Sequence, residues 1–283
     1  MISFKKAADL RNYLDTQQKQ SRKIGFVPTM GALHTGHISL VTSSKKDCDV
    51  TVCSIFVNPA QFNDAKDFQK YPITTEDDIF MLKTAGCDIL FIPSVEEIYP
   101  DGFLSKINYD IGYLESILEG KFRPGHFQGV CRVMQRLLEI VKPTHLYLGQ
   151  KDFQQCMVIS RLIELLKLSE KIKLVICPTL REANGLAMSS RNMRLNQIEQ
   201  KKATAIYQSL IMIKQKIDKT NIPELKKEAE RILEKNNFKT DYVEIGLAEN
   251  LQLVNEWDGK QKLVALIAAY MNEVRLIDNM QLN

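Results

Sequence analysis

The sequence has no apolar stretch long enough to cross a bilayer, which takes about 20 consecutive apolar residues. Its first segment, residues 1–18, also lacks the apolar core and the small-residue cleavage site of a signal peptide. The segment instead has the spacing of an amphipathic helix, with Leu10, Tyr13 and Leu14 on one face. We therefore expect a cytoplasmic protein that has no membrane partner.

Paired cysteines are absent as well. The 6 cysteines stand singly, most of them beside Val, Ile or Met, and none belongs to a CxxC pair or has a zinc-binding spacing with histidine. This distribution predicts reduced and mostly buried thiols.

The chain also lacks a strong excess of one charge. It has 38 Lys and Arg against 34 Asp and Glu, without a long run of like charges. This balance indicates neither a nucleic-acid tail nor a membrane-surface patch, and it suits a small anionic ligand. Internal repeats and low-complexity segments are missing too. With 45% hydrophobic and 25% charged residues, the 283-residue chain has the composition of a globular protein with a substantial core.

Short β-rich runs alternate with longer helical patterns in residues 1–180, which is typical of βαβ units that build a parallel sheet. The apolar strand candidates are Ile24–Val27, Val50–Phe56, Asp88–Ile92, Leu146–Leu148 and Lys173–Cys177. Helical periodicity is clearest over His37–Lys46, Thr74–Ala85, Gly129–Val141 and Phe153–Leu166. This order predicts an α/β fold with a doubly wound, Rossmann-like parallel sheet over residues 1–177. Such sheets bind ligands beyond the carboxyl ends of their strands.

The composition changes after Arg194. A helical segment rich in Lys and Glu, Asn196–Lys235, is interrupted near Pro223, and β-like runs follow at Thr240–Ile245 and Lys262–Met271. We therefore expect residues 178–283 to form a smaller α+β domain that acts as a lid.

The strongest functional pattern runs from Gly25 to His37 and reads G-F-V-P-T-M-G-A-L-H-T-G-H. It follows the first predicted strand and opens a helix, whose free N–H groups and positive dipole end suit phosphate oxygens. Gly31 and Gly36 let a bulky ligand approach the backbone. His34 and His37 can share one face of the helical turn. Both could donate hydrogen bonds to phosphates as charge shifts toward a leaving pyrophosphate.

Two other interpretations of the histidine pair are less favoured. Ordinary surface histidines do not account for the fact that two of only 4 histidines frame a glycine at a strand-to-helix junction. A zinc site would need further ligands at a suitable spacing, and the sequence offers none.

Two further segments offer phosphate-binding groups. Met188–Arg191 lies in a glycine-containing loop after the last strand of the sheet, although a loop of Ser and Arg is by itself usually solvated surface. Gly149–Asp152 directly follows another strand, where Lys151 can meet a phosphate as a point charge. Asp152 could accept ribose hydroxyls or simply cap the next helix.

Uncharged and cationic side chains occupy two more segments. Asn58 and Gln61 follow a strand and could hydrogen-bond a hydroxy acid without adding charge, although plain loop surface is the default for Gln61. Gly120–Gly129 is dense in glycine and holds Arg123 and His126, which suits either a lid or a surface loop.

Together these segments resemble the pantothenate synthetases. The similar stretches, in chain order, read PTMGALHTGH, FVNPAQF, RPGHFQGV, LGQKDFQQ and REANGLAMSSRN, and a late LIDN (Leu276–Asn279) is also similar. The resemblance implies a ligase that makes pantoyl adenylate and pyrophosphate from pantoate and ATP. The amine of β-alanine would then displace AMP and give pantothenate. It also implies Mg²⁺ on the ATP phosphates and a homodimer.

The resemblance further implies roles for individual residues. His34, His37 and Lys151 would be catalytic. The ATP-binding residues would be Met30, Gly31, Ala32, Leu33, His34, Thr35, Gly36, His37, Gly149, Gln150, Lys151, Asp152, Pro178, Met188, Ser189, Ser190 and Arg191. Pantoate and β-alanine would be bound by Gln61, Gln155, Asn58, Arg123 and His126. Phosphate oxygens would hold the magnesium, so no protein ligand is assigned to it. Asp77 and Asp78 could support the metal or Gln155, but a solvated helix face is the favoured interpretation for both.

Four positions depart from the family pattern. Asn63 stands where Gly is common, Ile73 where Arg is common, Gln150 where Glu or Lys is frequent, and Asn184 where Asp is frequent. Ile73 removes a possible ion pair at a helix end.

The main alternative is an adenylyl- or cytidylyltransferase that acts on a phosphorylated small molecule, which would need a further basic cluster. An aminoacyl-tRNA synthetase fragment would need a basic RNA-binding face, which the C-terminal segment lacks. A non-catalytic nucleotide-binding regulator would have no need of both histidines, Lys151 and the Ser-Ser-Arg loop together.

Overall fold

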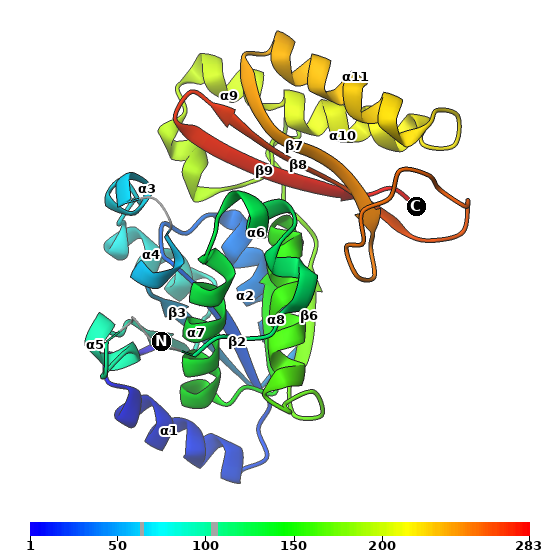
Figure 1. The fold of residues 1–283 in the computed structure, drawn as a ribbon. Helices are drawn as coiled ribbons and strands as arrows, with labels where there is room; N and C mark the ends of the chain where they lie inside the picture. Colours follow the sequence, from blue (N-terminus) through cyan, green and yellow to red (C-terminus); the bar gives the residue numbers. More distant parts are fainter. Residues whose placement is uncertain (63–64, 103–106) are drawn as a thin grey trace. The chain divides into compact units, whose positions relative to one another are not determined.

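The computed structural model describes residues 1–62, 65–102 and 107–283, so the departure at Asn63 lies outside the described residues. The chain is divided into two compact units (Figure 1). The first unit comprises Met1–Gly149 and Gln155–Pro178, and the second comprises Gln150–Gln154 and Thr179–Asn283. The segment Gln150–Gln154 therefore groups with the C-terminal residues, whereas the sequence pattern placed it with the first unit. The lid role of residues 178–283 stays a prediction.

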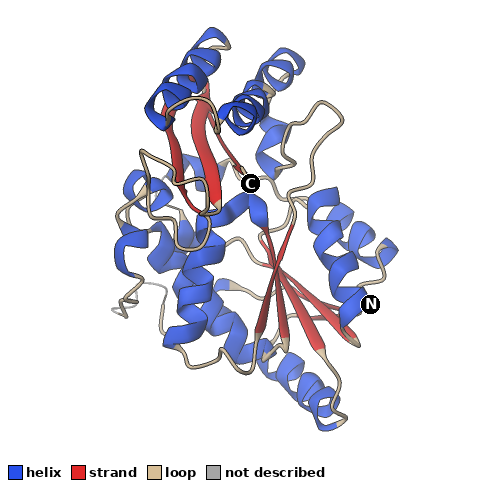
Figure 2. Ribbon diagram, turned by 90° about the vertical axis from the view of Figure 1, so that its right-hand side faces the viewer, coloured by secondary structure: helices blue, strands red, loops and turns tan. Residues whose placement is uncertain are grey.

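A parallel sheet forms the centre of the first unit, with the strand order β1-β4-β3-β2-β5-β6. Its strands are β1 (Ile2–Phe4), β2 (Ile24–Thr29), β3 (Val50–Ile55), β4 (Ile89–Phe91), β5 (His145–Gly149) and β6 (Lys173–Cys177). Strands β2 and β3 are buried along almost their whole length because helices cover both faces of the sheet (Figure 2). The structure thus confirms the predicted doubly wound parallel sheet.

Helices of very different lengths connect these strands. They are α1 (Ala7–Lys19), α2 (Thr35–Asp47), α3 (Ala65–Gln69), α4 (Thr75–Thr84), α5 (Val95–Ile98), α6 (Leu118–Phe122), α7 (His126–Val141) and α8 (Phe153–Leu165), with 3₁₀ turns η1 (Pro59–Gln61), η2 (Gly112–Glu115) and η3 (Gln150–Asp152). Leu40 of α2 and Leu82 of α4 share a buried cluster with Val27 and Leu90 of the sheet. Among the described residues, no helix combines the length and the apolar character needed to cross a membrane.

The winding of the sheet reverses between β2 and β5. From β2 the chain goes on through β3 to β4 on one side, and from β5 it goes on to β6 on the other side. The loops that leave two such strands diverge, and ligands of doubly wound sheets bind in the crevice at their carboxyl ends. This topology places the candidate site after Thr29 and Gly149, where the histidine pattern and one phosphate-binding segment begin.

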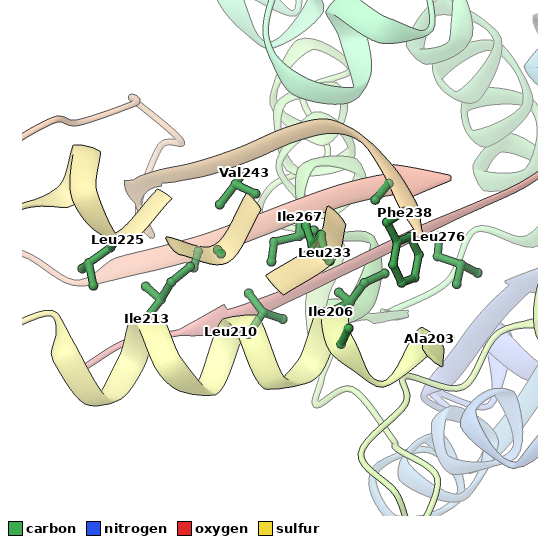
Figure 3. Close-up of a cluster of buried hydrophobic side chains, with 14 of the residues drawn as sticks. Ala203, Ile206, Leu210, Ile213, Leu225, Leu233, Phe238, Val243, Ile267 and Leu276 are labelled. Carbon is green, nitrogen blue, oxygen red and sulfur yellow. The ribbon is translucent and has the colours of Figure 1, made fainter. Parts of the chain in front are cut away.

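The second unit is built on an antiparallel sheet with the order β7-β8-β9. Its elements are η4 (Ser190–Arg194), α9 (Gln197–Ala203), α10 (Ala205–Lys216), α11 (Ile222–Lys235), β7 (Phe238–Leu247), β8 (Leu263–Met271) and β9 (Val274–Gln281). Leu210 and Ile213 of α10 and Leu225 of α11 pack with Ile267 of β8 in one hydrophobic core (Figure 3). Pro223 lies in the first turn of α11, where its missing N–H costs no helical hydrogen bond, so it opens this helix.

Two strands were not predicted from the sequence. Strand β1 has only 3 residues, which is too short for an alternating pattern, and it is recognised only through its pairing with β4. Strand β9 contains Asp278 and Asn279, which interrupt its apolar pattern although both are buried. Polar side chains inside a strand point to a local structural or functional use, which is described below.

The cysteines are all buried and free of disulfides, in agreement with the sequence-based prediction. Burial raises the pKa of the Cys87 thiol to about 11 and that of Cys131 to about 12. Because the thiolate is the reactive form, we expect a thiol-specific dye to modify none of the thiols quickly in the native protein near neutral pH. All should react after denaturation. Fast labelling of one thiol in the native state would show that this thiol is accessible to the dye and not buried.

Candidate active site

The turn Met30–His34 connects β2 to α2 and has an unusual backbone. Gly31 has φ +82° and Ala32 has φ +48°, both in the left-handed region. A Cβ atom on Gly31 would lie 3.1 Å from Asp78 Oδ2 and 3.1 Å from Ile55 Cγ2. Glycine suits this position because it adopts a positive φ readily and has no Cβ atom that would press against Asp78 and Ile55. Close packing against β3 and α4 is thus one cause for the glycine at this position, whereas the predicted approach of a bulky ligand to Gly31 stays a prediction.

Asp78 holds this turn from the neighbouring helix α4. Its carboxylate accepts hydrogen bonds from the Ala32 N–H (3.0 Å) and the Leu33 N–H (2.7 Å), and a third from the Thr74 hydroxyl (3.0 Å). Only 1% of Asp78 is exposed. The expectation of a solvated helix face is therefore wrong for Asp78, while Asp77 beside it is exposed. Helical periodicity could not reveal this role, because the partner groups are backbone amides far away in the sequence.

The two histidines lie at the start of α2 and share a reciprocal capping arrangement. The Gly36 N–H donates to His34 Nδ1 (3.1 Å), and the His34 N–H donates to His37 Nδ1 (3.3 Å). The ring centroids are 4.1 Å apart. Because a backbone N–H can only donate, both Nδ1 atoms must be acceptors, so each neutral ring carries its proton on Nε2. The geometry thus presets both imidazoles as Nε2–H donors.

Asn58 and Gln61 follow β3, where the sequence placed them. The Asn58 amide donates to the Gly129 carbonyl (3.2 Å) and to Gln61 Oε1 (3.4 Å), while its Oδ1 accepts from the Tyr99 hydroxyl (2.8 Å). Asn58 is only 1% exposed, whereas Gln61 is half-buried. Asn58 therefore ties η1 to helix α7 and orients Gln61.

His126 supports the same segment from the first turn of α7. Its Nδ1 lies 2.7 Å from the Gln61 carbonyl oxygen, and its Nε2 lies 3.1 Å from Arg123 Nη1. A carbonyl can only accept and a guanidinium can only donate, so His126 is neutral with its proton on Nδ1. It is buried, and Arg123 also pairs with Glu119 at 3.5 Å. The segment that the sequence suggested as a lid or surface loop thus contributes a buried residue of helix α7.

The predicted phosphate-binding segment Gly149–Asp152 is divided between the units, because Gly149 belongs to the first and Gln150–Asp152 to the second. In the second unit, Asn279 of β9 holds Gln150 and Lys151. The Asn279 amide donates to the backbone carbonyls of Gln150 (2.9 Å) and Lys151 (2.8 Å). Lys151 Nζ lies 3.5 Å from Asp152 Oδ1, and its side chain is mostly buried. Gln150, one of the departures from the family pattern, also donates to Asn279 Oδ1 at 3.4 Å.

The loop that carries Met188–Arg191 folds back on itself. The Met188 N–H donates to the Leu180 carbonyl (3.0 Å), and the Ser189 hydroxyl accepts from the Arg191 N–H (3.2 Å), which begins η4. Ser190 is buried, while Met188, Ser189 and Arg191 are half-buried. Asn184 accepts from the Leu186 N–H at 3.0 Å, so the amide at this departing position still provides the acceptor that an Asp would provide.

Arg181 anchors the base of this loop to β9. Its guanidinium binds both carboxylate oxygens of Asp278 at 2.5 and 3.1 Å, donates to the Asn279 carbonyl at 3.3 Å, and stacks on the Tyr207 ring at 4.6 Å. Burial raises the pKa of the Asp278 carboxyl, and the Arg181 guanidinium opposes this rise. Gly185 (φ +91°) lets the loop pass over Tyr207, because a Cβ atom there would lie within van der Waals radii of the ring. The dipeptide Asp278-Asn279 therefore holds both predicted phosphate-binding segments of the second unit.

The remaining predicted site residues lie at or near the carboxyl ends of strands β5 and β6. Gly149 ends β5, Gln155 lies half-buried in the first turn of α8, and Pro178 is exposed directly after β6. Ile73, the fourth departure, is 79% exposed before α4. The sequence pattern gave no role to Arg181, Asp278 or Asn279, although the last two had been noted in LIDN. For Asp78 it favoured a solvated helix face over a supporting role.

The described residues contain no group of three or more His, Cys, Asp or Glu side chains placed to hold a metal ion. The donors that the two units offer are imidazole, ammonium, guanidinium, hydroxyl and backbone N–H groups. Such groups suit phosphate oxygens rather than a cation.

Known proteins match this chain over nearly its whole length. The family model described as pantoate-beta-alanine ligase matches residues 2–281. Among curated relatives, pantothenate synthetase from Cytophaga hutchinsonii is 46% identical over 285 residues, with 99% of each chain covered. Pantothenate synthetase from Flavobacterium psychrophilum is 43% identical, with 100% of each chain covered.

Solved structures agree with this assignment. Pantothenate synthetase from Thermus thermophilus superposes with a TM-score of 0.91 at 37% identity, covering 100% of this chain and 99% of that one. Pantoate-beta-alanine ligase from Francisella tularensis, crystallised with beta-gamma ATP and beta-alanine, superposes with a TM-score of 0.83 at 40% identity, covering 99% of this chain and 97% of that one. By sequence, fold and the order of its site segments, the chain is a ligase and belongs to the pantoate-beta-alanine ligase family.

Proposed function

We propose that this ligase forms pantothenate from pantoate, β-alanine and ATP in two steps at the carboxyl ends of β2 and β5. In the first step a pantoate carboxylate oxygen attacks the α phosphorus of ATP, and pyrophosphate leaves. In the second step the amine of β-alanine attacks the carbonyl of pantoyl adenylate, and AMP leaves. The observation that carries this proposal is the pair of imidazoles preset as Nε2–H donors at the start of α2.

The first step needs charge stabilisation more than it needs a nucleophile from the protein. The attacking carboxylate belongs to the substrate, so correct positioning and preorganised donors are sufficient. As the α–β bridge breaks, negative charge grows on the departing oxygens, where His34 and His37 can donate from Nε2. Their rings need not reorient during the reaction, because backbone N–H groups hold both Nδ1 atoms.

Groups suited to the rest of ATP occur in each unit taken by itself. In the first unit, Met30–Gly36 offers the glycine-lined turn and the N-terminus of α2 for phosphates. In the second unit, Lys151 offers a point charge to a phosphate, Gln150 and Asp152 offer polar groups to a nucleotide, and Ser189, Ser190 and Arg191 offer donors to a phosphate tail. The family relative from Francisella tularensis, crystallised with an ATP analogue, supports ATP as the substrate.

Pantoate would be bound mainly by Gln61 and Gln155, whose amides can pair with hydroxyl and carboxylate oxygens. The contacts of Asn58 and His126 favour a supporting role, since both side chains are buried and hydrogen-bond to Gln61. Arg123 would remain a candidate for the carboxylate of β-alanine at the entrance.

Magnesium, a homodimer and a cytoplasmic location complete the proposal. The site chemistry fits a Mg²⁺ ion that arrives bound to ATP, because Mg²⁺ commonly relies on substrate phosphates and few protein ligands. The ion would neutralise phosphate charge. Buried cysteines that form no disulfide suit the reducing cytoplasm. Sedimentation of the purified protein would test the dimer.

Isotope exchange between pyrophosphate and ATP tests the first step. With pantoate and Mg²⁺ present and β-alanine left out, we expect exchange that depends strictly on pantoate. If the enzyme is folded and binds ATP but shows no such exchange, the proposed formation of pantoyl adenylate is rejected. A nucleotidyltransferase that uses a phosphorylated acceptor would then become the better assignment.

Replacement of Asn279 by alanine tests the link between β9 and the Lys151 segment. Each lost hydrogen bond contributes about 0.5–1.5 kcal/mol, so we expect the KM for ATP to rise roughly tenfold with a smaller change in kcat. The exposed Asn272 in the turn before β9 provides a control, and Asn272→Ala should leave the KM for ATP unchanged. An unaltered KM in Asn279→Ala would show that this link does not position the ATP-binding groups.

A further inference from the structure

We propose that Asp78 is a positioning residue for adenylate formation, which acts by holding the turn that carries His34 and His37. The inference rests on the proposed function of the histidine pair. It assigns a role to a buried carboxylate that contacts neither histidine side chain. Asp78 acts on the backbone through Ala32 and Leu33, directly before His34.

The contacts require an acceptor with two oxygen atoms. Asp78 Oδ2 accepts from the Ala32 N–H at 3.0 Å, and Oδ1 accepts from the Leu33 N–H at 2.7 Å. A carboxylate has only acceptors, so it can bind two successive N–H groups at once. An amide of the same shape would turn an NH₂ group toward one of them. The Thr74 hydroxyl, 3.0 Å from Oδ1, holds the carboxylate in place.

The buried charge of Asp78 is balanced by donors of the first unit. In addition to its three hydrogen-bond donors, the carboxylate lies in the first turn of α4, where the helix dipole favours a negative charge. Only 1% of the residue is exposed, so water cannot replace these contacts. Loss of one oxygen would leave a buried backbone N–H without its partner.

The turn depends on this support because its backbone is strained. Ala32 has φ +48°, a conformation that L-residues other than Asn and Asp adopt rarely. The peptide between Ala32 and Leu33 leads into His34, whose N–H sets the tautomer of His37. If the turn relaxes, the two Nε2–H groups no longer point in their preset directions. A displacement of about 1 Å at catalytic groups can cost a hundredfold in rate.

The test compares Asp78→Asn with the wild-type enzyme in the two half-reactions. We expect the kcat of pantoate-dependent pyrophosphate exchange to fall about a hundredfold in Asp78→Asn. Amide formation from supplied pantoyl adenylate and β-alanine should stay near the wild-type rate, because pyrophosphate has already left. Asp77→Asn, a change at the exposed neighbour on the same helix turn, serves as the matched control and should behave like wild type.

A double-mutant cycle separates positioning from general damage. If Asp78 acts through the histidines, Asp78→Asn should add little to the loss already caused by His37→Ala. Equal slowing of both half-reactions, or full additivity with His37→Ala, would overturn the proposal.

A readout independent of activity covers the case in which the proposed function itself fails. Nitrogen-15 spectra of the imidazoles report the tautomer of each of the 4 histidines. We expect Nε2–H signals for His34 and His37 in the wild type and mixed tautomers in Asp78→Asn. Unchanged signals would reject the positioning role. Absent exchange in the wild-type enzyme would reject the proposed function instead, and the spectra alone would then decide the role of Asp78.

Discussion

Replacing His37 by alanine is expected to slow pantoate-dependent pyrophosphate exchange by about a hundred- to a thousandfold, the usual cost of removing one preorganised donor to a developing anion. The His37 ring is held by the His34 N–H at 3.3 Å, so its Nε2–H needs no reorganisation as pyrophosphate departs. The KM for ATP should change much less, because the donor acts mainly on charge that develops in the transition state.

Two variants make this expectation specific. His37→Gln keeps a donor near the Nε2 position and should recover part of the rate. His145→Gln changes a histidine at the first residue of β5, at the opposite end of the parallel sheet from the histidine turn, and should leave exchange unaltered. Near-normal exchange in folded His37→Ala would remove the histidine pair from the mechanism.

Replacing Arg181 by leucine is expected to lower the free energy of unfolding by about 3–5 kcal/mol at neutral pH, as found when one partner of a buried ion pair is removed. Asp278 is 4% exposed and would keep a buried charge without its bidentate partner. The stacking of the guanidinium on Tyr207 would also be lost. Urea unfolding of the intact protein measures this loss.

The pH dependence of the Arg181→Leu loss has a definite sign. Burial already raises the pKa of the Asp278 carboxyl, and removal of Arg181 should raise it further. A carboxyl whose pKa is higher in the folded protein than in the unfolded chain takes up a proton on folding. Its stabilising effect is therefore complete below the unfolded pKa and is lost as pH rises through the folded pKa. The loss in Arg181→Leu should thus shrink toward acid pH.

A second substitution checks the origin of that loss. Adding Asp278→Asn to Arg181→Leu removes the buried charge and should restore part of the stability, with little remaining pH dependence. A loss in Arg181→Leu that is the same at all pH values and is not relieved by Asp278→Asn would mean that lost packing on Tyr207, rather than the unpaired carboxylate, explains the effect.

The histidine turn could be predicted from the sequence because its determinants are local. Gly31, His34, Gly36 and His37 lie in one strand-to-helix junction, and their capping hydrogen bonds join residues two or three positions apart. The parallel sheet was predictable for a similar reason, since strands covered on both faces contain short apolar runs such as Ile89–Phe91 of β4.

The residues that hold the site could not be predicted in the same way. Asp78 meets Ala32 across 46 positions of sequence, and Asn279 meets Lys151 across 128. The sequence around Asp78 does not distinguish a buried acceptor from a solvated side chain, and the sequence around Asn279 does not show that its amide donates to the Gln150 and Lys151 carbonyls. The one available signal was that Asp278 and Asn279 interrupt the apolar pattern of β9. The same interruption kept the strand from being predicted.

The fate of one pantoate oxygen atom shows whether the reaction passes through pantoyl adenylate. The enzyme would receive pantoate labelled with oxygen-18 in its carboxylate, together with ATP, Mg²⁺ and β-alanine, and the AMP formed would be analysed by mass spectrometry. Attack of the carboxylate on the α phosphorus leaves a pantoate oxygen on that phosphorus when β-alanine displaces AMP. We therefore predict AMP that carries one labelled oxygen. Pantothenate formed together with unlabelled AMP would contradict the pantoyl-adenylate route.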